Sequence, residues 1–305
     1  MIPRVTHAIV ASSSVNHTGP DAKRAFLWGT EDRKQSLRVL LKAETAESRI
    51  SPSLKTCGEF DVELAKKQHE AYVNLLREIG LDVIELPPDD LLPEGVFVEN
   101  TAVICNGVAL VGKSDNQMRQ NEDESMKIML KKELNIPVIE IENRNAQLDG
   151  GDVLFTGREF FVGISKYTNE DGARAVAMAF PEYPCTPIKV PGNKRLKYFV
   201  TMAGPDVLSV STSDICQEIV KRMEREASFA YQKITLPEEH AANMLYINGT
   251  VIHRAPEEIP ESHKIIKDKI DIPSRQINIS AFSNFSCGLT SSCLLLRRWK
   301  SIRNI

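Results

Sequence analysis

The 305-residue sequence lacks the features that would take a chain across a membrane or onto a nucleic acid. No uninterrupted apolar run approaches the length that spans a bilayer, and no apolar leader-like segment stands near the first residues. Basic residues form no long run, and the net charge is −3 with a pI near 6.1. Such a charge gives no surplus for binding phosphate backbones. We therefore expect a cytoplasmic protein with neither a membrane nor a nucleic-acid partner.

Cysteine is also sparse, and no pair has the CxxC spacing. The six residues are scattered over the chain: Cys57, Cys105, Cys185, Cys216, Cys287 and Cys293. In a cytoplasmic protein of this length, such cysteines are typical of free thiols rather than of a disulfide framework. No His/Cys cluster has the spacing of a zinc site, so we expect no metal.

What the sequence does contain is a repeated hairpin pattern, in which two apolar runs flank a glycine-containing turn. The hairpins are predicted at Val103–Leu110, Val153–Val162, Tyr198–Val210 and Met244–His253. Each is followed by helical periodicity and a short strand such as IPVIEI. After the third hairpin, for example, Ile215, Ile219 and Met223 are predicted to lie on one helix face.

A fifth unit is divided between the two halves of the sequence. A helical stripe that includes Tyr72 and Leu76 stops at Gly80 before the strand DVIEL, and the strands THAIV and CLLL would complete its hairpin. The period is roughly 45–50 residues, and units that cannot bury a face alone are expected to close into a ring. We predict one α/β domain of five-fold pseudosymmetry over residues 1–305.

The segment Thr18–Phe60 fits none of these units. It is polar and contains glycine, proline and serine, so we predict an insertion or mobile loop, with a helix allowed at Arg33–Thr45.

The most unusual stretch is LDGGDVLFTGREFFVG at Leu148–Gly163. The glycine pair Gly150-Gly151 lets a backbone approach a ligand or another segment closely, and an acid on either side indicates a cationic approaching group. A tight turn with solvated carboxylates accounts for the same residues equally well.

Unusual polar residues gather at the start of each first hairpin strand. They are Glu99-Asn100, Asp149 to Asp152, Arg195 to Lys197, Glu238-Glu239-His240 and Cys287 to Cys293. In a closed ring these starts would converge on the axis, which predicts a ligand site there. Hydrophilic loops that merely flank strands are the alternative.

The sequence resembles the dimethylarginine dimethylaminohydrolases, or dimethylargininases, over nearly all of the chain except Thr18–Phe60. The resemblance is carried by LDGGDVLFTGREFFVG, ELPPDDLLPEGVFVENTAVI, MAGPD and GLTSSCLLL. It implies the five-bladed α/β-propeller, or pentein, fold of the guanidino-modifying enzymes. It also implies hydrolysis of methylated arginine to citrulline and a methylamine, with no cofactor.

The implied chemistry is attack of a cysteine thiolate on the guanidinium carbon, with a histidine that protonates the leaving amine and then activates water. By this resemblance Cys293 stands at the nucleophile position and Asp149 at the acid that orients the histidine. Glu99 matches a carboxylate that faces the guanidinium. Arg119 matches an arginine that grips the substrate α-carboxylate, and Glu94 stands where the family has an aspartate for the α-amino group.

Several positions depart from the family pattern. Arg195 replaces the catalytic histidine, Asn100 replaces the second guanidinium-binding aspartate, and Tyr167 replaces the other carboxylate-gripping arginine. Cys287 stands in place of an aspartate. An arginine cannot shuttle protons near neutral pH, although it can stabilise a thiolate. We predict that Arg195 pairs with Asp149 and repels a guanidinium substrate.

The other histidines of the sequence are poor candidates to take over the role of the catalytic histidine. Only His240 lies at the start of a strand that could face the axis, and most lone histidines have structural or surface roles.

Three hypotheses follow. In the first, the protein has lost standard dimethylargininase activity and binds a small guanidino or amino-acid ligand or a protein partner. In the second, it is an active hydrolase with an altered substrate or a rebuilt acid/base. In the third, Cys287 and Cys293 form an oxidisable pair in a redox-responsive protein.

Overall fold

The computed structural model describes residues 7–11, 61–86, 95–282 and 288–296. Within these ranges the strands form five three-stranded sheets, none of which closes on itself. In every sheet the middle strand pairs antiparallel with one neighbour and parallel with the other. The strands of each sheet lie side by side in the order named. The first sheet contains β15 (Leu294–Leu296), β1 (His7–Ala11) and β2 (Asp82–Leu86), and the second contains β3 (Ala102–Cys105), β4 (Val108–Val111) and β5 (Val138–Ile139). The third contains β6 (Val153–Phe155), β7 (Phe160–Ile164) and β8 (Cys185–Lys189), the fourth contains β9 (Val200–Gly204), β10 (Val207–Ser211) and β11 (Gln232–Leu236), and the fifth contains β12 (Leu245–Ile247), β13 (Thr250–Arg254) and β14 (Ser274–Ile277).

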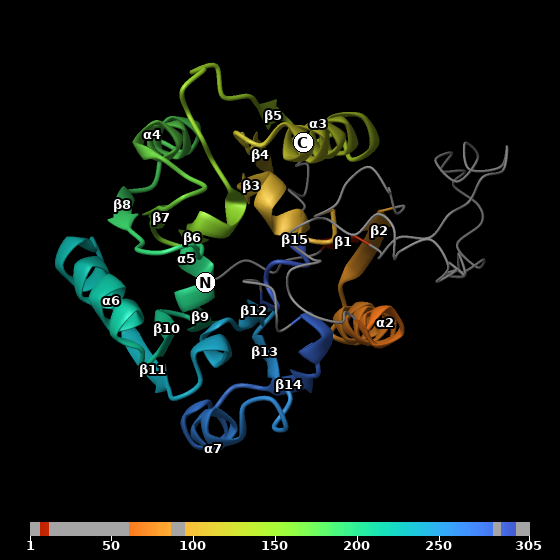
Figure 1. Cartoon of the computed structure of the whole chain (residues 1–305), viewed down its shortest axis with the longest axis vertical. Coiled ribbons are helices and arrows are strands. Elements are labelled where there is room, and N and C mark those ends of the chain that lie inside the picture. Colours follow the sequence, from red (N-terminus) through yellow and green to blue (C-terminus); the bar gives the residue numbers. More distant parts are fainter. Residues whose placement is uncertain (1–6, 12–60, 87–94, 283–287, 297–305) are drawn as a thin grey trace, which may run out of the picture.

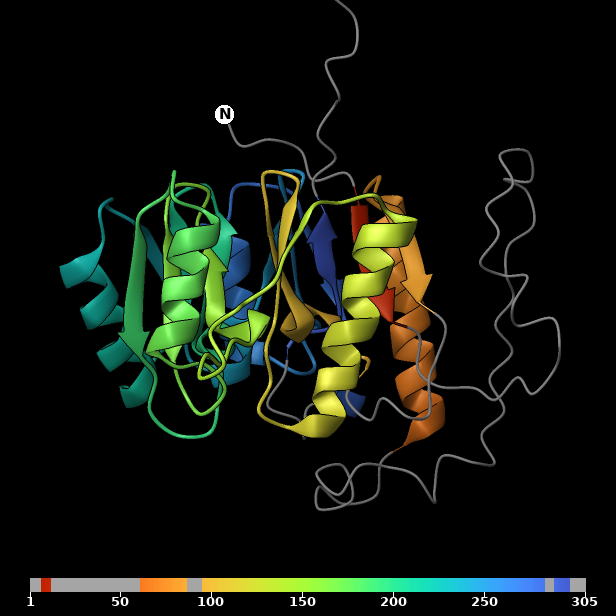
Figure 2. The same ribbon diagram turned by 90° about the horizontal axis from the view of Figure 1, so that it is seen from above.

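Among the described residues, one helix lies between the middle strand of each sheet and its parallel neighbour, and these helices lie on the outside of the molecule (Figure 1). They are α2 (Val62–Glu78), α3 (Gln117–Ile128), α4 (Glu170–Ala179), α6 (Asp214–Glu226) and α7 (Pro260–Lys269). A π-helical turn, η4 (Met129–Glu133), extends α3. From the side, these helices and the strands run in nearly the same direction (Figure 2). The predicted strand–turn–strand–helix–strand unit is therefore confirmed in four sheets, whereas in the sheet β15–β1–β2 the two antiparallel strands are far apart in the sequence and are not joined by a turn.

The local chemistry of the sequence explains the hairpins. Asn106 and Gly107 have φ values of 50° and 78°, and Asn248 and Gly249 have 49° and 80°. Two successive positive φ angles are what a two-residue type I′ turn requires, and Asn-Gly is its preferred sequence.

The first unit is completed across the sequence, as predicted. β1 pairs antiparallel with β15, with His7 opposite Leu296 and Ile9 opposite Leu294, and it pairs parallel with β2. Segments far apart in the sequence thus share one sheet.

The apolar faces of helices and sheets pack against each other. In the fourth unit, Leu208 and Val210 of β10 contact Ile219 and Met223 of α6, and all four side chains are buried. Burial of each such side chain contributes about 1.5–3 kcal/mol. The predicted α6 stripe was wrong at Ile215, which is 40% exposed, because Cys216 takes the buried position of the first helical turn.

Two other expectations were wrong in detail. Tyr198 and Phe199, predicted to begin a strand, belong to the short helix α5 (Leu196–Phe199), and β9 begins at Val200. Of the predicted strand IPVIEI, only Val138 and Ile139 pair as β5. Thr18–Phe60 and its helix at Arg33–Thr45 lie outside the described residues.

None of the described helices combines the length and the apolar character that crossing a bilayer requires.

Candidate functional site

Short helical turns precede the innermost strands and position the polar residues. They are η3 (Val98–Thr101) before β3, η5 (Gly150–Asp152) before β6, α5 before β9 and η6 (Glu239–Ala242) before β12. η3 contacts η5, η5 contacts α5, and α5 contacts η6. The Glu99 amide also donates to the carbonyl of Ser291, which precedes β15. The structure therefore brings together the segments that were predicted to converge.

The glycine pair allows a very close approach, as its sequence predicted. A Cβ at Gly150 would overlap the Glu99 carbonyl oxygen, and a Cβ at Gly151 would lie 2.5 Å from Cδ of Arg195. The cationic group that reaches this turn is thus an arginine of the same chain.

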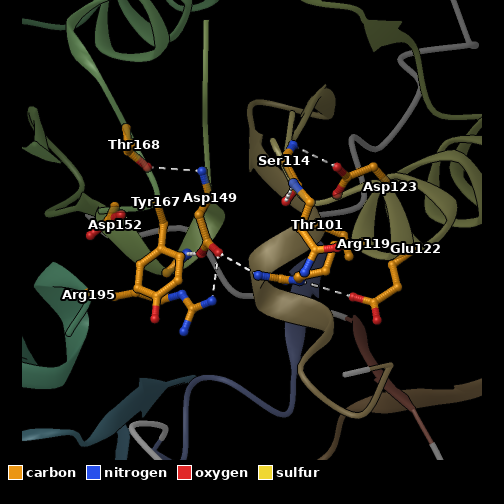
Figure 3. A network of polar contacts seen from close by, with 12 residues as sticks. Thr101, Ser114, Arg119, Glu122, Asp123, Asp149, Asp152, Tyr167, Thr168 and Arg195 are labelled. Carbon is orange, nitrogen blue, oxygen red and sulfur yellow. Dashed lines mark hydrogen bonds and ion pairs between the residues drawn. The ribbon is translucent and has the colours of Figure 1, made fainter. Parts of the chain in front are cut away.

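Asp149 lies between two guanidinium groups, as Figure 3 shows. Its Oδ2 is 2.9 Å from Nη2 of Arg195 and 3.1 Å from Nη1 of Arg119. Its Oδ1 accepts a hydrogen bond from the Gly151 amide at 2.8 Å, and its own amide donates to Thr168 Oγ1 at 3.0 Å. The predicted pairing of Arg195 with Asp149 is confirmed.

The electrostatics of this cluster keep Asp149 ionised. Burial alone would raise the pKa of its carboxyl, but Arg195 and Arg119 outweigh burial and hold that pKa below its ordinary value. Burial likewise opposes the charge on Arg195, yet Asp149 outweighs it and raises the pKa of the guanidinium further. Arg195 therefore remains a fixed cation and cannot exchange a proton near neutral pH.

Tyr167 holds the other side of Arg195. Its ring centroid lies 4.1 Å from Cζ of Arg195, a cation–π distance, and its hydroxyl donates to the Asn193 carbonyl at 3.3 Å. In Figure 3 the Arg195 guanidinium lies beside the Tyr167 ring, and a dashed line joins it to Asp149. The residue expected in place of a carboxylate-gripping arginine thus contacts Arg195.

Arg119, which the resemblance assigned to a substrate α-carboxylate, has internal acidic partners. Besides Asp149 it contacts Glu122, whose Oε2 lies 3.3 Å from Nε of Arg119. Asp123 follows in the same helix and accepts a hydrogen bond from the Ser114 amide at 3.1 Å. Burial raises the pKa of Asp123 to about 7 against that hydrogen bond and the charge of Arg119.

Asp152 is fully buried on the other side of the glycine pair. It accepts hydrogen bonds from Ser165 Oγ at 2.6 Å and from the Leu196 amide at 2.9 Å. Burial, together with the charge of Asp149, raises the pKa of Asp152 to about 7. The Asp152 carboxyl thus links Ser165, in the loop before Tyr167, to Leu196, the residue after Arg195.

A second ion pair, which the sequence reasoning missed, involves Glu99. Lys197 Nζ donates to Glu99 Oε1 at 2.6 Å, and Thr290 Oγ1 donates to Oε2 at 2.8 Å. Asn243 joins the same group, because its Nδ2 donates to the Lys197 carbonyl at 2.7 Å and to Thr290 Oγ1 at 3.0 Å. The only signal in the sequence was the position of Lys197, two residues after Arg195.

Cys293 is 2% exposed and lies beside Tyr72, whose hydroxyl donates to the Leu289 carbonyl at 2.8 Å. Burial raises the pKa of the Cys293 thiol to about 12. The hydrogen bond with Tyr72 and the charge of Lys197 act in the opposite direction, while Glu99 adds to the rise. At neutral pH Cys293 is therefore a protonated thiol in this arrangement.

The remaining predicted residues lie as follows. Asn100 is 3% exposed in η3, and its Oδ1 is 2.9 Å from the point that a Cβ on Gly151 would occupy. Glu94 and Cys287 lie outside the described residues. His240 has its Nε2 3.1 Å from the Glu258 carbonyl oxygen. Among the described side chains, no histidine forms a hydrogen bond or an ion pair with Asp149.

The described residues contain no group of three or more His, Cys, Asp or Glu side chains placed to hold a metal ion. The chemistry available at the cluster is charge compensation between buried acids and bases, next to a neutral thiol.

Comparison with known proteins places this geometry in context. A family model described as N,N dimethylarginine dimethylhydrolase, eukaryotic, matches residues 38–247. The human protein described as putative hydrolase DDAH2 is 34% identical over 245 residues, which cover 77% of this chain and 86% of that protein. The N(G),N(G)-dimethylarginine dimethylaminohydrolase of Pseudomonas aeruginosa is 26% identical over 242 residues, which cover 79% of this chain and 91% of that protein.

The fold is shared as well. A crystal structure of the Pseudomonas aeruginosa enzyme, a cysteine-to-serine mutant complexed with citrulline, superimposes with a TM-score of 0.71 at 20% identity. The match covers 96% of this chain and 100% of that one.

Proposed function

The chain belongs to the family of eukaryotic N,N-dimethylarginine dimethylhydrolases, and from this premise we propose that it keeps the dimethylargininase fold but binds a ligand or partner instead of hydrolysing a substrate. In this proposal it lacks standard dimethylargininase activity and acts by holding a small ligand or a protein partner, in the cytoplasm.

The observation that carries the proposal is the ion pair of 2.9 Å between Arg195 and Asp149. By the family resemblance, this acid would orient a histidine that moves protons in both half-reactions. A guanidinium at that position cannot donate a proton to a leaving amine, because its pKa lies above about 12. Loss of general acid/base catalysis typically lowers a rate by about 10²–10⁴-fold.

The thiol supports the same conclusion. Thiolate, not thiol, is the nucleophile, and the pKa of about 12 leaves Cys293 protonated at pH 7. A cysteine poised for attack would instead have its pKa lowered by neighbouring positive charge.

The charges around the site also disfavour an arginine-like ligand. Lys197 neutralises Glu99, and Arg195 and Arg119 neutralise Asp149. Neither Glu99 nor Asp149 keeps an uncompensated negative charge that could attract a guanidinium. A neutral or anionic ligand therefore fits the cluster better than a cation.

The alternative is an active hydrolase with a rebuilt acid/base. It is favoured by the retention of Cys293 beside Tyr72, with Glu99 and Lys197 close enough to affect the pKa of the thiol. The redox hypothesis needs Cys287, which lies outside the described residues.

We also propose that the five units close into a five-bladed ring and that the whole chain is one domain, with residues 18–60 as an insertion. The five equivalent sheets, the contacts between the short turns at their inner ends and the β1–β15 pairing support this architecture.

The deciding experiment is a citrulline-release assay with asymmetric dimethylarginine. We expect no release above background for the wild type, and a gain of activity for Arg195→His combined with Asn100→Asp. Arg195→Lys keeps the positive charge and serves as the matched control, which should release no citrulline above background. Wild-type turnover as fast as that of the Pseudomonas aeruginosa enzyme assayed in parallel, and abolished by Cys293→Ser, would overturn the proposal.

A further inference from the structure

A concave region lies on the rim of the molecule, outside the polar cluster. It is a cavity of about 860 Å³ over β8, lined by the start of α4 and the second half of α6. Figure 1 shows these two helices on either side of β8. The volume is within the range of small-molecule sites, roughly 300–1,000 Å³.

Positive side chains dominate the lining. Its charged residues are Lys166, Glu170, Lys189, Arg222, Arg225 and Glu226. Arg225 pairs with Glu226 at 2.7 Å, whereas Lys166 and Lys189 are exposed and have no ion-pair partner among the described residues. Arg222 pairs with Glu218, and Glu170 is exposed without an ion pair among the described residues. Two unpaired ammonium groups and one unpaired carboxylate thus line the cavity, which leaves a surplus of positive charge.

Apolar residues make up part of the cavity lining. Ile188 and Val190 are buried, and Pro187 is exposed. A ligand that fits both parts carries negative charge on one portion and an apolar or ring-shaped body on another.

The edge of β8 argues against an extended peptide as this ligand. Pro187 has no N–H to offer an added strand, and Arg222 Nη1 donates to the Lys189 carbonyl at 2.9 Å. An edge strand protected in these two ways does not accept another strand readily.

We propose that this cavity binds a small phosphate-bearing molecule, whose phosphate oxygens contact Lys166 and Lys189. A phosphate group has close to two negative charges at neutral pH and three acceptor oxygens. A ligand with a phosphate group therefore suits two separate ammonium groups better than a ligand with a single carboxylate does. The proposal does not depend on whether Cys293 is catalytic.

The cavity wall also continues into the polar cluster. Lys166 is followed directly by Tyr167, and the lining loop at Val190 to Gly192 leads to Arg195. Ser165, another lining residue, donates to Asp152, which also accepts the Leu196 amide. A ligand that orders these two loops therefore restrains the Arg195–Tyr167 pair.

Titration calorimetry with inorganic pyrophosphate on the full chain tests the site. We expect saturable binding to the wild type and an affinity about tenfold lower in both Lys166→Met and Lys189→Met, since each loses a charge-assisted contact. Lys221→Met, an exposed lysine of α6 outside the lining, is the matched control and should change the affinity by less than about twofold. Citrate, a carboxylate of comparable charge, should bind more weakly.

The proposal would be overturned if pyrophosphate did not bind, or if the lining variants bound it as tightly as the wild type. It would also be overturned if Lys221→Met lost as much affinity as the lining variants, or if citrate bound more tightly than pyrophosphate. Hydrogen exchange supplies the second readout: at a pyrophosphate concentration near the wild-type dissociation constant, amide exchange in residues 190–196 should slow clearly in the wild type and much less in Lys189→Met. Binding without this protection would overturn the link to Arg195.

Discussion

Asp149 and Asp152 are three positions apart and buried to a similar degree, yet their pKa values are shifted in opposite directions. Asp149 faces two guanidinium groups, and these outweigh the effect of burial. Asp152 accepts hydrogen bonds from the hydroxyls of Ser165 and Thr168 and from the Leu196 amide, and the negative charge of Asp149 adds to the effect of burial. Identical side chains in one motif thus differ because of what other segments bring to them.

This difference predicts a pH dependence of stability. The folded-state pKa of Asp152, about 7, lies above the ordinary 3.8, so the folded state binds this proton more tightly than the unfolded state. The resulting stability is full below about pH 4 and is lost as the pH rises to about 7. Asp149 has the opposite sign, since its lowered pKa contributes stability that is lost as the pH falls.

Asp152→Asn should remove the loss at higher pH, because the amide keeps the shape without the charge. Urea unfolding at pH 5 and pH 8 should show a smaller drop in unfolding free energy for the variant than for the wild type, by on the order of a few kcal/mol. Asp268→Asn, on an exposed position of α7, is the control and should leave the drop unchanged. A variant with the wild-type pH dependence would show that Asp152 is not the titrating group.

The Cys293 thiol gives a second prediction at this scale. With a pKa of about 12, its thiolate fraction at pH 7.5 is on the order of 10³ lower than that of an ordinary cysteine. Labelling with iodoacetamide, followed by peptide mass spectrometry, should be at least about 100-fold slower at Cys293 in the folded protein than in urea. Rapid labelling of the native thiol would instead favour the active-hydrolase alternative.

At the scale of secondary structure, elements encoded by local chemistry could be predicted and those that depend on distant partners could not. The Asn-Gly hairpins follow from the positive φ angles that their turns require. The short helix α5 does not follow from its own residues, since its first amide is held by Asp152 of another unit.

The candidate site shows the same division. The close approach at Gly150-Gly151 could be expected from residue types, and the pairing of Arg195 with Asp149 from the family resemblance. The ion pair of Lys197 with Glu99 could not, because an isolated lysine in a sequence is most simply solvated. Its partner lies 98 positions away, so spacing carried no information about it.

At the scale of the whole molecule, Asn243 connects three units. Its amide nitrogen donates to the Lys197 carbonyl and to Thr290, and its Oδ1 accepts the Thr290 amide. Asn243→Ala leaves these buried groups unpaired and should lower the unfolding free energy by about 2–4 kcal/mol. Urea unfolding measures the change, with Asn121→Ala, at an exposed position of α3, as the control that should shift it by less than about 1 kcal/mol. An equally small effect at Asn243 would refute this connecting role.

The pairing of β1 with β15 has a consequence for the order of folding during synthesis. β1 emerges from the ribosome before the other described strands, but its antiparallel partner β15 emerges after the strands of the four other sheets have been translated. Until then β1 and β2 can form only a two-stranded parallel pair with an open edge, and parallel pairs of this kind are weak on their own. The earliest-made sheet is therefore the last to be completed, and a stalled or truncated chain exposes that edge to neighbouring chains.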